Sequence, residues 1–173
     1  LSKAQHAAAI WIVAIGSNLS ALWILIANSF MQQPTGFEIV NGRAQMTDFF
    51  SLVANPNVWF QFPHVVFSGL ATASFFVLGI SAYHLIRKNE VDFFQRSFKI
   101  AAISGLVFSI LVGVLGHGQT QHLIGTQPMK LAAAEALFET EDPASFSLLT
   151  IGDLSGRKEI FAIRVPYILS FLS

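Results

Sequence analysis

The chain has 173 residues, of which 53% are hydrophobic and only 12% are charged, against about 25% charged residues in ordinary soluble domains. This composition excludes a typical soluble domain and indicates a membrane protein. The formal net charge of zero argues against a nucleic-acid partner, and the absence of cysteine from the sequence excludes disulfide bonds and thiolate metal sites.

Three apolar runs are long enough to cross a bilayer. The first, residues 7–30, carries no charge and corresponds to roughly 36 Å of helix. The second, residues 58–86, has no Asp, Glu, Lys or Arg and contains His64 and His84, and the third covers about residues 98–115. The sequence therefore predicts an all-α fold, a polytopic transmembrane helical bundle over residues 1–115.

Small residues recur every four positions on two of these spans. Gly105, Ser109 and Gly113 form such a stripe on the third span, and Gly16 and Ser20 do so on the first. Small-residue stripes let neighbouring helices approach closely in a membrane. They favour a packed bundle but indicate no activity.

The basic residues of the loops predict the orientation. Residues 31–57 hold only Arg43, whereas the short connection 87–99 holds Arg87, Lys88, Arg96 and Lys99. The positive-inside rule then places residues 87–99 in the cytoplasm and residues 31–57 outside. Residues 116–164 must therefore form a second external loop.

This external loop is predicted to contain one short amphipathic helix. Residues 116–128, GHGQTQHLIGTQP, are rich in glycine and polar residues and predict irregular structure. Pro128 suits the first turn of a helix, which we expect over Met129–Glu139 on the outer surface of the bundle. One face of it would carry Leu131, Ala134, Leu137 and Phe138.

Two charged residues of this segment, Lys130 and Glu135, are five positions apart. Ion pairs that stabilise a helix occur at spacings of three or four. Five residues turn a helix by roughly 500°, so these side chains point about 140° apart. Either both are merely solvated, or each points at something else.

His64 is the first candidate for chemistry. It follows Pro63, taken as the start of the second span, and so is expected in the first helical turn. Ser68, Ala71 and Thr72 follow on its face and leave room for a flat ring, and an imidazole can hold haem iron as an axial ligand. The alternative is an interfacial histidine that is hydrogen-bonded to a neighbouring carbonyl.

The remaining histidines and the methionines are weaker candidates. His84 lies about 30 Å further along the helix beside basic residues, as is typical of an interfacial surface residue. His117 and His122, spaced by five, make a weak metal motif without nearby carboxylates. A packing role is the expectation for the three methionines, Met31, Met46 and Met129.

Three blocks together carry a resemblance: GSNLSALWILIAN at 16–28, FPHVVFSGL at 62–70 and QPMKLAAAE at 127–135. They resemble subunit I of the cytochrome bd-type quinol oxidases, and the similarity covers essentially the whole chain. It implies an excerpt with three consecutive spans and the start of the external quinol-binding loop. Leu1 is not a start methionine, and the apolar run at 165–173 is about half of a further span, in agreement with an excerpt.

The resemblance implies an activity. Members of this family are multi-pass proteins of bacterial or archaeal cytoplasmic membranes. They oxidise a membrane quinol on the outer side and reduce dioxygen to water, using two b-type haems and one d-type haem. The implied partners are the lipid bilayer, the remainder of subunit I, a subunit II and small accessory subunits.

The resemblance also implies site residues. His64 matches the family's histidine ligand to the low-spin b haem, whose second ligand is a methionine beyond Ser173. Lys130 and Glu135 match a lysine and a glutamate that are implicated in quinol oxidation, and Gln127 aligns with a polar residue of the same block. The ligands of the high-spin b and d haems belong to stretches outside this chain.

Further matches carry less information. Ser20 and Asn28 match span residues associated with a proton path and with the haem surroundings, and His117 stands where some members have an acidic residue. Two other classes of protein would account for the spans alone: a polytopic transporter or channel, and a non-catalytic haem-binding membrane anchor. Neither accounts for the three matched blocks.

Overall fold

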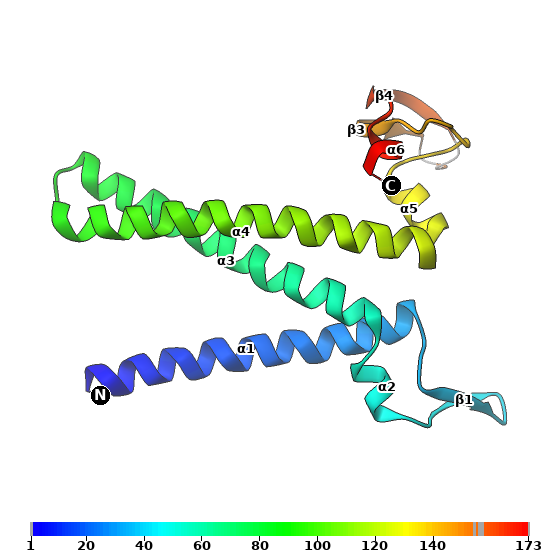
Figure 1. Ribbon diagram of the computed structural model, residues 1–173, viewed down its shortest axis with the longest axis horizontal. Helices are drawn as coiled ribbons and strands as arrows, with labels where there is room; N and C mark the ends of the chain where they lie inside the picture. Colours follow the sequence, from blue (N-terminus) through cyan, green and yellow to red (C-terminus); the bar gives the residue numbers. More distant parts are fainter. Residues whose placement is uncertain (1, 154, 156–157, 173) are drawn as a thin grey trace. The chain divides into compact units, whose positions relative to one another are not determined.

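The structure is a computed structural model that describes residues 2–153, 155 and 158–172 (Figure 1). It divides into two compact units, Leu1–Gly116 and His117–Ser173. Most of the first unit is helical, whereas the second combines short helices with a two-stranded sheet.

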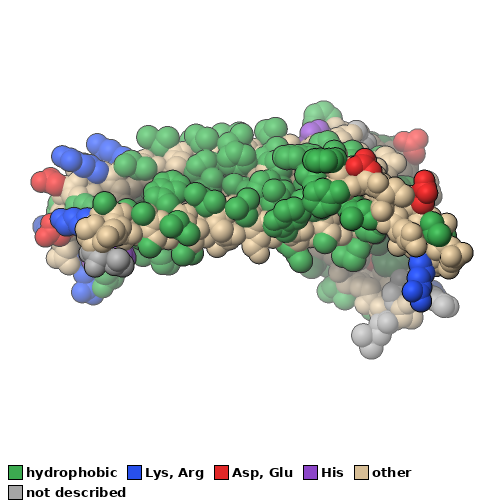
Figure 2. Space-filling model, turned by 90° about the horizontal axis from the view of Figure 1, so that it is seen from below, with side chains coloured by type: hydrophobic (Ala, Val, Ile, Leu, Met, Phe, Trp, Pro, Cys, Tyr) green, Lys and Arg blue, Asp and Glu red, His purple; other side chains and the backbone are tan. Residues whose placement is uncertain are grey.

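Three of the described helices are long and apolar enough to cross a membrane: α1 (Lys3–Gln32), α3 (Pro56–Ile86) and α4 (Val91–Thr126). They contain the three predicted spans and confirm the predicted helical membrane fold. Their apolar side chains are largely exposed, as expected of helices that face lipid or further helices. Figure 2 shows these side chains along the helices, with charged side chains gathered towards the ends.

The start of α3 differs from the prediction. We expected Pro63 to begin the helix, but Pro63 lies inside it and the helix begins at Pro56. The reason is the Asn55–Pro56 pair. The side chain of Asn55 accepts a hydrogen bond from the backbone N–H of Asn57, and proline suits the first helical position. The prediction that His64 lies in the first turn is therefore wrong, because it lies just over two turns from the start.

A small hairpin and a short helix connect α1 to α3. Strand β1 (Phe37–Val40) pairs antiparallel with β2 (Arg43–Met46) through a turn in which Asn41 and Gly42 both have positive φ. Asn-Gly is the residue pair that such a tight turn favours. Helix α2 (Phe49–Val53) follows, and its amino end is capped by the Asp48 carboxylate. The all-helical expectation missed this hairpin.

Helices α3 and α4 meet through small residues. The hydroxyl oxygens of Ser74 and Ser104 are 3.0 Å apart, and a Cβ added at Gly105 would lie 3.5 Å from the Ser74 Cβ. This contact agrees with the predicted role of Gly105. At Gly16 and Gly113, an added Cβ would meet nothing within 4 Å in the described part of the chain.

Helix α4 continues beyond the expected end of the third span. Residues 116–126 were predicted to be irregular, but they are helical as far as Thr126. Glycine in a helix interior costs only about 1 kcal/mol, and this stretch has no proline to break the hydrogen-bond ladder. The helix ends where the chain reaches Pro128, because the preceding residue, Gln127, is pushed out of the helical conformation.

In the second unit, α5 (Pro128–Ala134) precedes an antiparallel hairpin of β3 (Phe146–Gly152) and β4 (Glu159–Val165). This sheet lies in the region predicted to be a loop with one helix. Helix α6 (Ile168–Leu172) follows, so the apolar run at 165–173 is not one continuous helix. The hydroxyl of Ser170 in α6 accepts a hydrogen bond from the backbone N–H of Ala144 at 2.7 Å.

Candidate functional site

His64 projects from α3 towards α4 in the first unit. The imidazole is half-buried, and its Nδ1 atom is buried without a hydrogen-bond partner among the residues that the structure describes. A Cβ added at Gly116 of α4 would lie 3.2 Å from His64 Cε1 and 3.6 Å from Nδ1. Any larger residue at position 116 would therefore require the His64 ring or the neighbouring backbone to shift.

The surroundings of His64 fit a group that takes one imidazole from this chain. Within residues 2–153, 155 and 158–172, no cluster of three or more metal-binding side chains occurs. A haem takes only one or two protein ligands, so a single imidazole with small residues beside it would fit such a group. Along the same face, Ser68 and Thr72 are small, and the Thr72 hydroxyl donates to the Ser68 carbonyl at 2.9 Å.

His84 also has a buried Nδ1 atom without a partner among the described residues, but its ring contacts differ from those of His64. Its ring stacks on that of Phe94 from α4, with centroids 4.1 Å apart and planes 2° apart, and it meets Tyr83 edge-on at 5.4 Å. His84 thus packs between the end of α3 and the start of α4. The sequence suggested an interfacial residue and did not reveal this stack.

The two polar residues proposed for α1 lie in different environments. Ser20 is exposed, whereas Asn28 is half-buried and accepts a hydrogen bond from Gln32 one turn later, at 3.0 Å. Sequence reasoning missed the buried polar residues nearby. Ser29, Asn57 and Gln61 are buried, and each has a side-chain atom without a partner in the described part of the molecule.

The second unit brings Gln127, Lys130 and Glu135 together on α5 and its ends. Gln127 is the N-cap residue, Lys130 is exposed in the first turn, and Glu135 is the half-buried C-cap residue. The predicted helix was too long: it ends at Ala134 instead of Glu139. Leu137 and Phe138 therefore do not share a helix face with Leu131 and Ala134.

The end of α5 explains this correction. Ala136 has a left-handed φ of 52°, its N–H bonds the Ala133 carbonyl at 3.3 Å, and the Leu137 N–H bonds the Ala132 carbonyl at 2.8 Å. This pair of bonds is a Schellman motif, which usually has glycine at the left-handed position. An alanine there gives no sequence signal for a helix end.

Arg164 of β4 is a residue that sequence reasoning missed. Its Nη2 atom donates to the Ala136 carbonyl at 3.2 Å and to Glu159 at 2.5 Å, and its Nη1 atom donates to Glu141 at 3.0 Å. Hydrogen bonds from the Ser145 hydroxyl and N–H, and the nearby charge of Arg164, lower the pKa of Glu141. No spacing in the sequence indicates these contacts, because they join residues that are 5, 23 and 28 positions apart.

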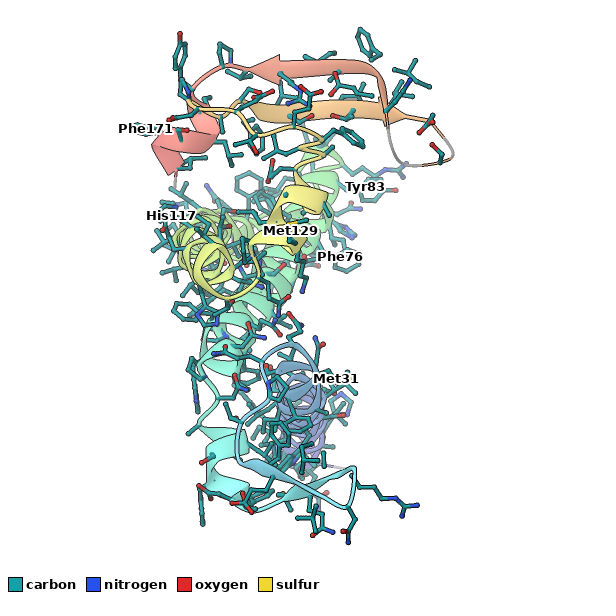
Figure 3. All side chains as sticks on the ribbon, turned by 90° about the vertical axis from the view of Figure 1, so that its right-hand side faces the viewer. Met31, Phe76, Tyr83, His117, Met129 and Phe171 are labelled. Carbon is teal, nitrogen blue, oxygen red and sulfur yellow. The ribbon has the colours of Figure 1, made fainter. Side chains whose placement is uncertain are left out.

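The other predicted histidines and methionines add no ligand group. His117 is exposed on α4, and Met129 is 82% exposed on α5 (Figure 3). His122 follows His117 by five positions on the same helix, so the two rings point about 140° apart. This separation does not suit a shared metal ion.

The fold and these residues define a multi-pass helical membrane protein with a histidine inside one of its spans. The chain belongs to the cytochrome bd terminal oxidase subunit I family, whose model matches residues 1–173. The expectation from the three sequence blocks is thereby confirmed, and membership of this family implies haem cofactors.

Individual relatives agree with this placement. The chain is 50% identical over its whole length to cytochrome bd ubiquinol oxidase subunit 1 of Bacillus subtilis and covers 37% of that protein. It is 40% identical to cytochrome bd-II ubiquinol oxidase subunit 1 of Escherichia coli, again over its whole length and 34% of the relative. The bd oxidase structure from Geobacillus thermodenitrificans is similar to the chain, with a TM-score of 0.82 and 31% sequence identity. The match covers 99% of this chain and 40% of the chain in that structure.

Proposed function

We propose that the chain is the central part of a terminal oxidase subunit that oxidises a membrane quinol and reduces dioxygen to water. The observation that carries this proposal is the family match over all 173 residues. A transporter, a channel or a non-catalytic anchor gives no reason for such a match. The chain spans about a third to two fifths of its relatives, so the complete activity requires the remainder of subunit I.

His64 is the proposed ligand of a low-spin haem b. Its half-buried ring beside Gly116 and its unpartnered Nδ1 atom support this role. A haem bound there supplies the one-electron redox chemistry that side chains lack. Asn28 belongs to the proposed haem surroundings and Ser20 to a proton path. A second haem b and a haem d would bind to parts of subunit I outside this chain.

Lys130 and Glu135 are the proposed catalytic residues for quinol oxidation, which releases two protons and two electrons. The Glu135 carboxylate can accept a proton from a quinol hydroxyl, and the Lys130 ammonium can donate a hydrogen bond to a ring oxygen. Their positions, in the first turn and at the C-cap of one short helix, suit two groups that contact different parts of one ring. The Gln127 amide adds a polar contact at the start of the same helix.

The proposed location is a bacterial or archaeal cytoplasmic membrane. Basic residues concentrate where α3 connects to α4, and by the positive-inside rule this supports a cytoplasmic position for the connection. Residues 116–164, including α5, then lie on the outer side, where they would meet quinol from the bilayer. A subunit II and small accessory subunits are the further proposed partners.

Two variants of the purified complex test these roles. For His64→Ala we expect loss of the low-spin b signal from the reduced-minus-oxidised spectrum. His84→Ala, which removes the ring contacts with Phe94 and Tyr83, should retain the signal. For Glu135→Gln we expect slow oxygen uptake with quinol and an intact haem spectrum, with Glu139→Gln as the charge-matched control. An unchanged spectrum for His64→Ala, or normal uptake for Glu135→Gln, would refute the corresponding role.

A further inference from the structure

We propose that Arg164 is a positioning residue for Glu135. Its guanidinium fixes the turn that ends α5 and so determines where the Glu135 carboxylate points. This inference rests on the proposed function of Glu135 as the group that accepts a proton from quinol. It adds a residue from β4, distant in sequence, to the quinol-oxidising arrangement.

The contacts of Arg164 join three segments of the second unit. The guanidinium donates to the carboxylates of Glu141, which precedes β3, and of Glu159, which begins β4. It also donates to the backbone carbonyl of Ala136, the residue directly after Glu135. The planar fork of an arginine can make these bonds at the same time, whereas a lysine ammonium lacks this fixed geometry.

The carbonyl that Arg164 holds belongs to a strained residue. Ala136 has φ of 52°, a conformation that L-residues other than glycine disfavour because Cβ approaches the following carbonyl oxygen. The helix end therefore lacks the residue that would favour it locally. The hydrogen bond from Arg164 compensates for the strain at Ala136. This bond forms only when the Ala136 carbonyl points at the guanidinium, so it favours the left-handed turn.

Glu135 depends on this turn because it is the C-cap residue of α5. Its backbone lies between the last helical turn and Ala136, and its side chain is half-buried. If the turn were released, α5 could fray or extend, and either change would reorient the carboxylate. Misplacement of a catalytic group by about 1 Å can cost on the order of 100-fold in rate.

The test uses the complete purified oxidase with a soluble short-chain quinol. For Arg164→Gln we expect kcat/KM for quinol to fall about 10-fold, within the range that small misplacements produce. The haem spectrum and the reaction of the fully reduced enzyme with dioxygen should stay unchanged, because neither requires quinol oxidation. Lys158→Gln removes a nearby positive charge whose side chain makes no hydrogen bond to Ala136 among the described residues, and it should match the wild type.

A double-mutant cycle separates positioning from general destabilisation. If Arg164 acts through Glu135, the double variant Glu135→Gln/Arg164→Gln is no slower than Glu135→Gln alone. Replacement of Ala136 by glycine removes the need for an external tether. We therefore expect Arg164→Gln/Ala136→Gly to recover several-fold in kcat/KM over Arg164→Gln.

Ala136→Val provides a test that keeps Arg164 in place, should Arg164→Gln fail to fold. A β-branched side chain strains the left-handed position further and should lower kcat/KM in the same way. Wild-type kinetics in Arg164→Gln would overturn the inference, and so would wild-type kinetics in Ala136→Val if Arg164→Gln does not fold. Multiplying effects in the cycle, or no recovery with Ala136→Gly, would also overturn it. Normal turnover of Glu135→Gln would instead overturn the proposed function itself.

Discussion

Gly116→Ala tests the placement of the His64 ring. The added methyl group would lie 3.2 Å from His64 Cε1, closer than the optimal separation of about 3.5–4.0 Å between carbon atoms. The imidazole or the helix backbone must then move by a few tenths of an ångström. His64 is the proposed haem ligand, so this displacement acts directly on the geometry at the iron.

The expected cost leaves the protein folded. Overpacking of this kind costs about 1–3 kcal/mol, whereas alanine stabilises a helix interior by roughly 0.5–1 kcal/mol relative to glycine. The two terms partly cancel, and the net destabilisation is about 0–2.5 kcal/mol. The effect should therefore appear in the haem rather than in the yield of protein.

The assay is the reduced-minus-oxidised visible spectrum and the midpoint potential of the low-spin haem b. Gly113→Ala is the matched control, because it lies on the same helix and its added Cβ would meet nothing within 4 Å of the described residues. We expect a shifted or weakened low-spin signal in Gly116→Ala only. Identical spectra and potentials in both variants would show that the His64 ring does not hold the iron.

Three further predictions concern the scaffold. Gly105→Leu should separate α3 from α4 at Ser74 and destabilise the complex by about 1–3 kcal/mol, measured as haem loss on heating. Gly69→Leu is the control and should not destabilise the complex, since an added Cβ there meets nothing within 4 Å in the described structure. Asp48→Ala removes the cap of α2 and should lower the hydrogen-exchange protection of the Phe50 amide. The hydrogen bond from the Ser51 hydroxyl lowers the pKa of Asp48 below its usual 3.8. The Asp48 cap therefore stabilises α2 above pH 3.8, and this stabilisation is lost as the pH falls through the lowered pKa. Constant protection of the Phe50 amide over this pH range would contradict the prediction.

The membrane helices could be predicted because length and apolar composition are properties of each segment alone. Their ends were harder to place, because several local signals compete. Pro63 was taken as a helix start, although Asn55–Pro56 combines a cap with a suitable first residue. The Asn41–Gly42 turn is also a local signal, and the hairpin that it forms was within reach of sequence reasoning.

The surroundings of the candidate residues could not be predicted in this way. The resemblance to a family indicated His64, Lys130 and Glu135, but it gave no contacts for them. Gly116 approaches His64 from another helix, and Arg164 holds the turn after Glu135 from a strand 28 positions beyond Ala136. Both contacts depend on tertiary folding, and neither residue belongs to a recognisable motif.

The most direct test of the account is anaerobic rapid mixing of quinol with the oxidase, followed at the absorbance that His64→Ala removes. General acid–base groups contribute about 10²–10⁴-fold to a rate. If Glu135 accepts the quinol proton, Glu135→Gln slows reduction of this haem by an amount in that range, while dithionite reduces it fully and Glu139→Gln behaves as the wild type. Reduction of Glu135→Gln by quinol at the wild-type rate would show that Glu135 does not act in quinol oxidation.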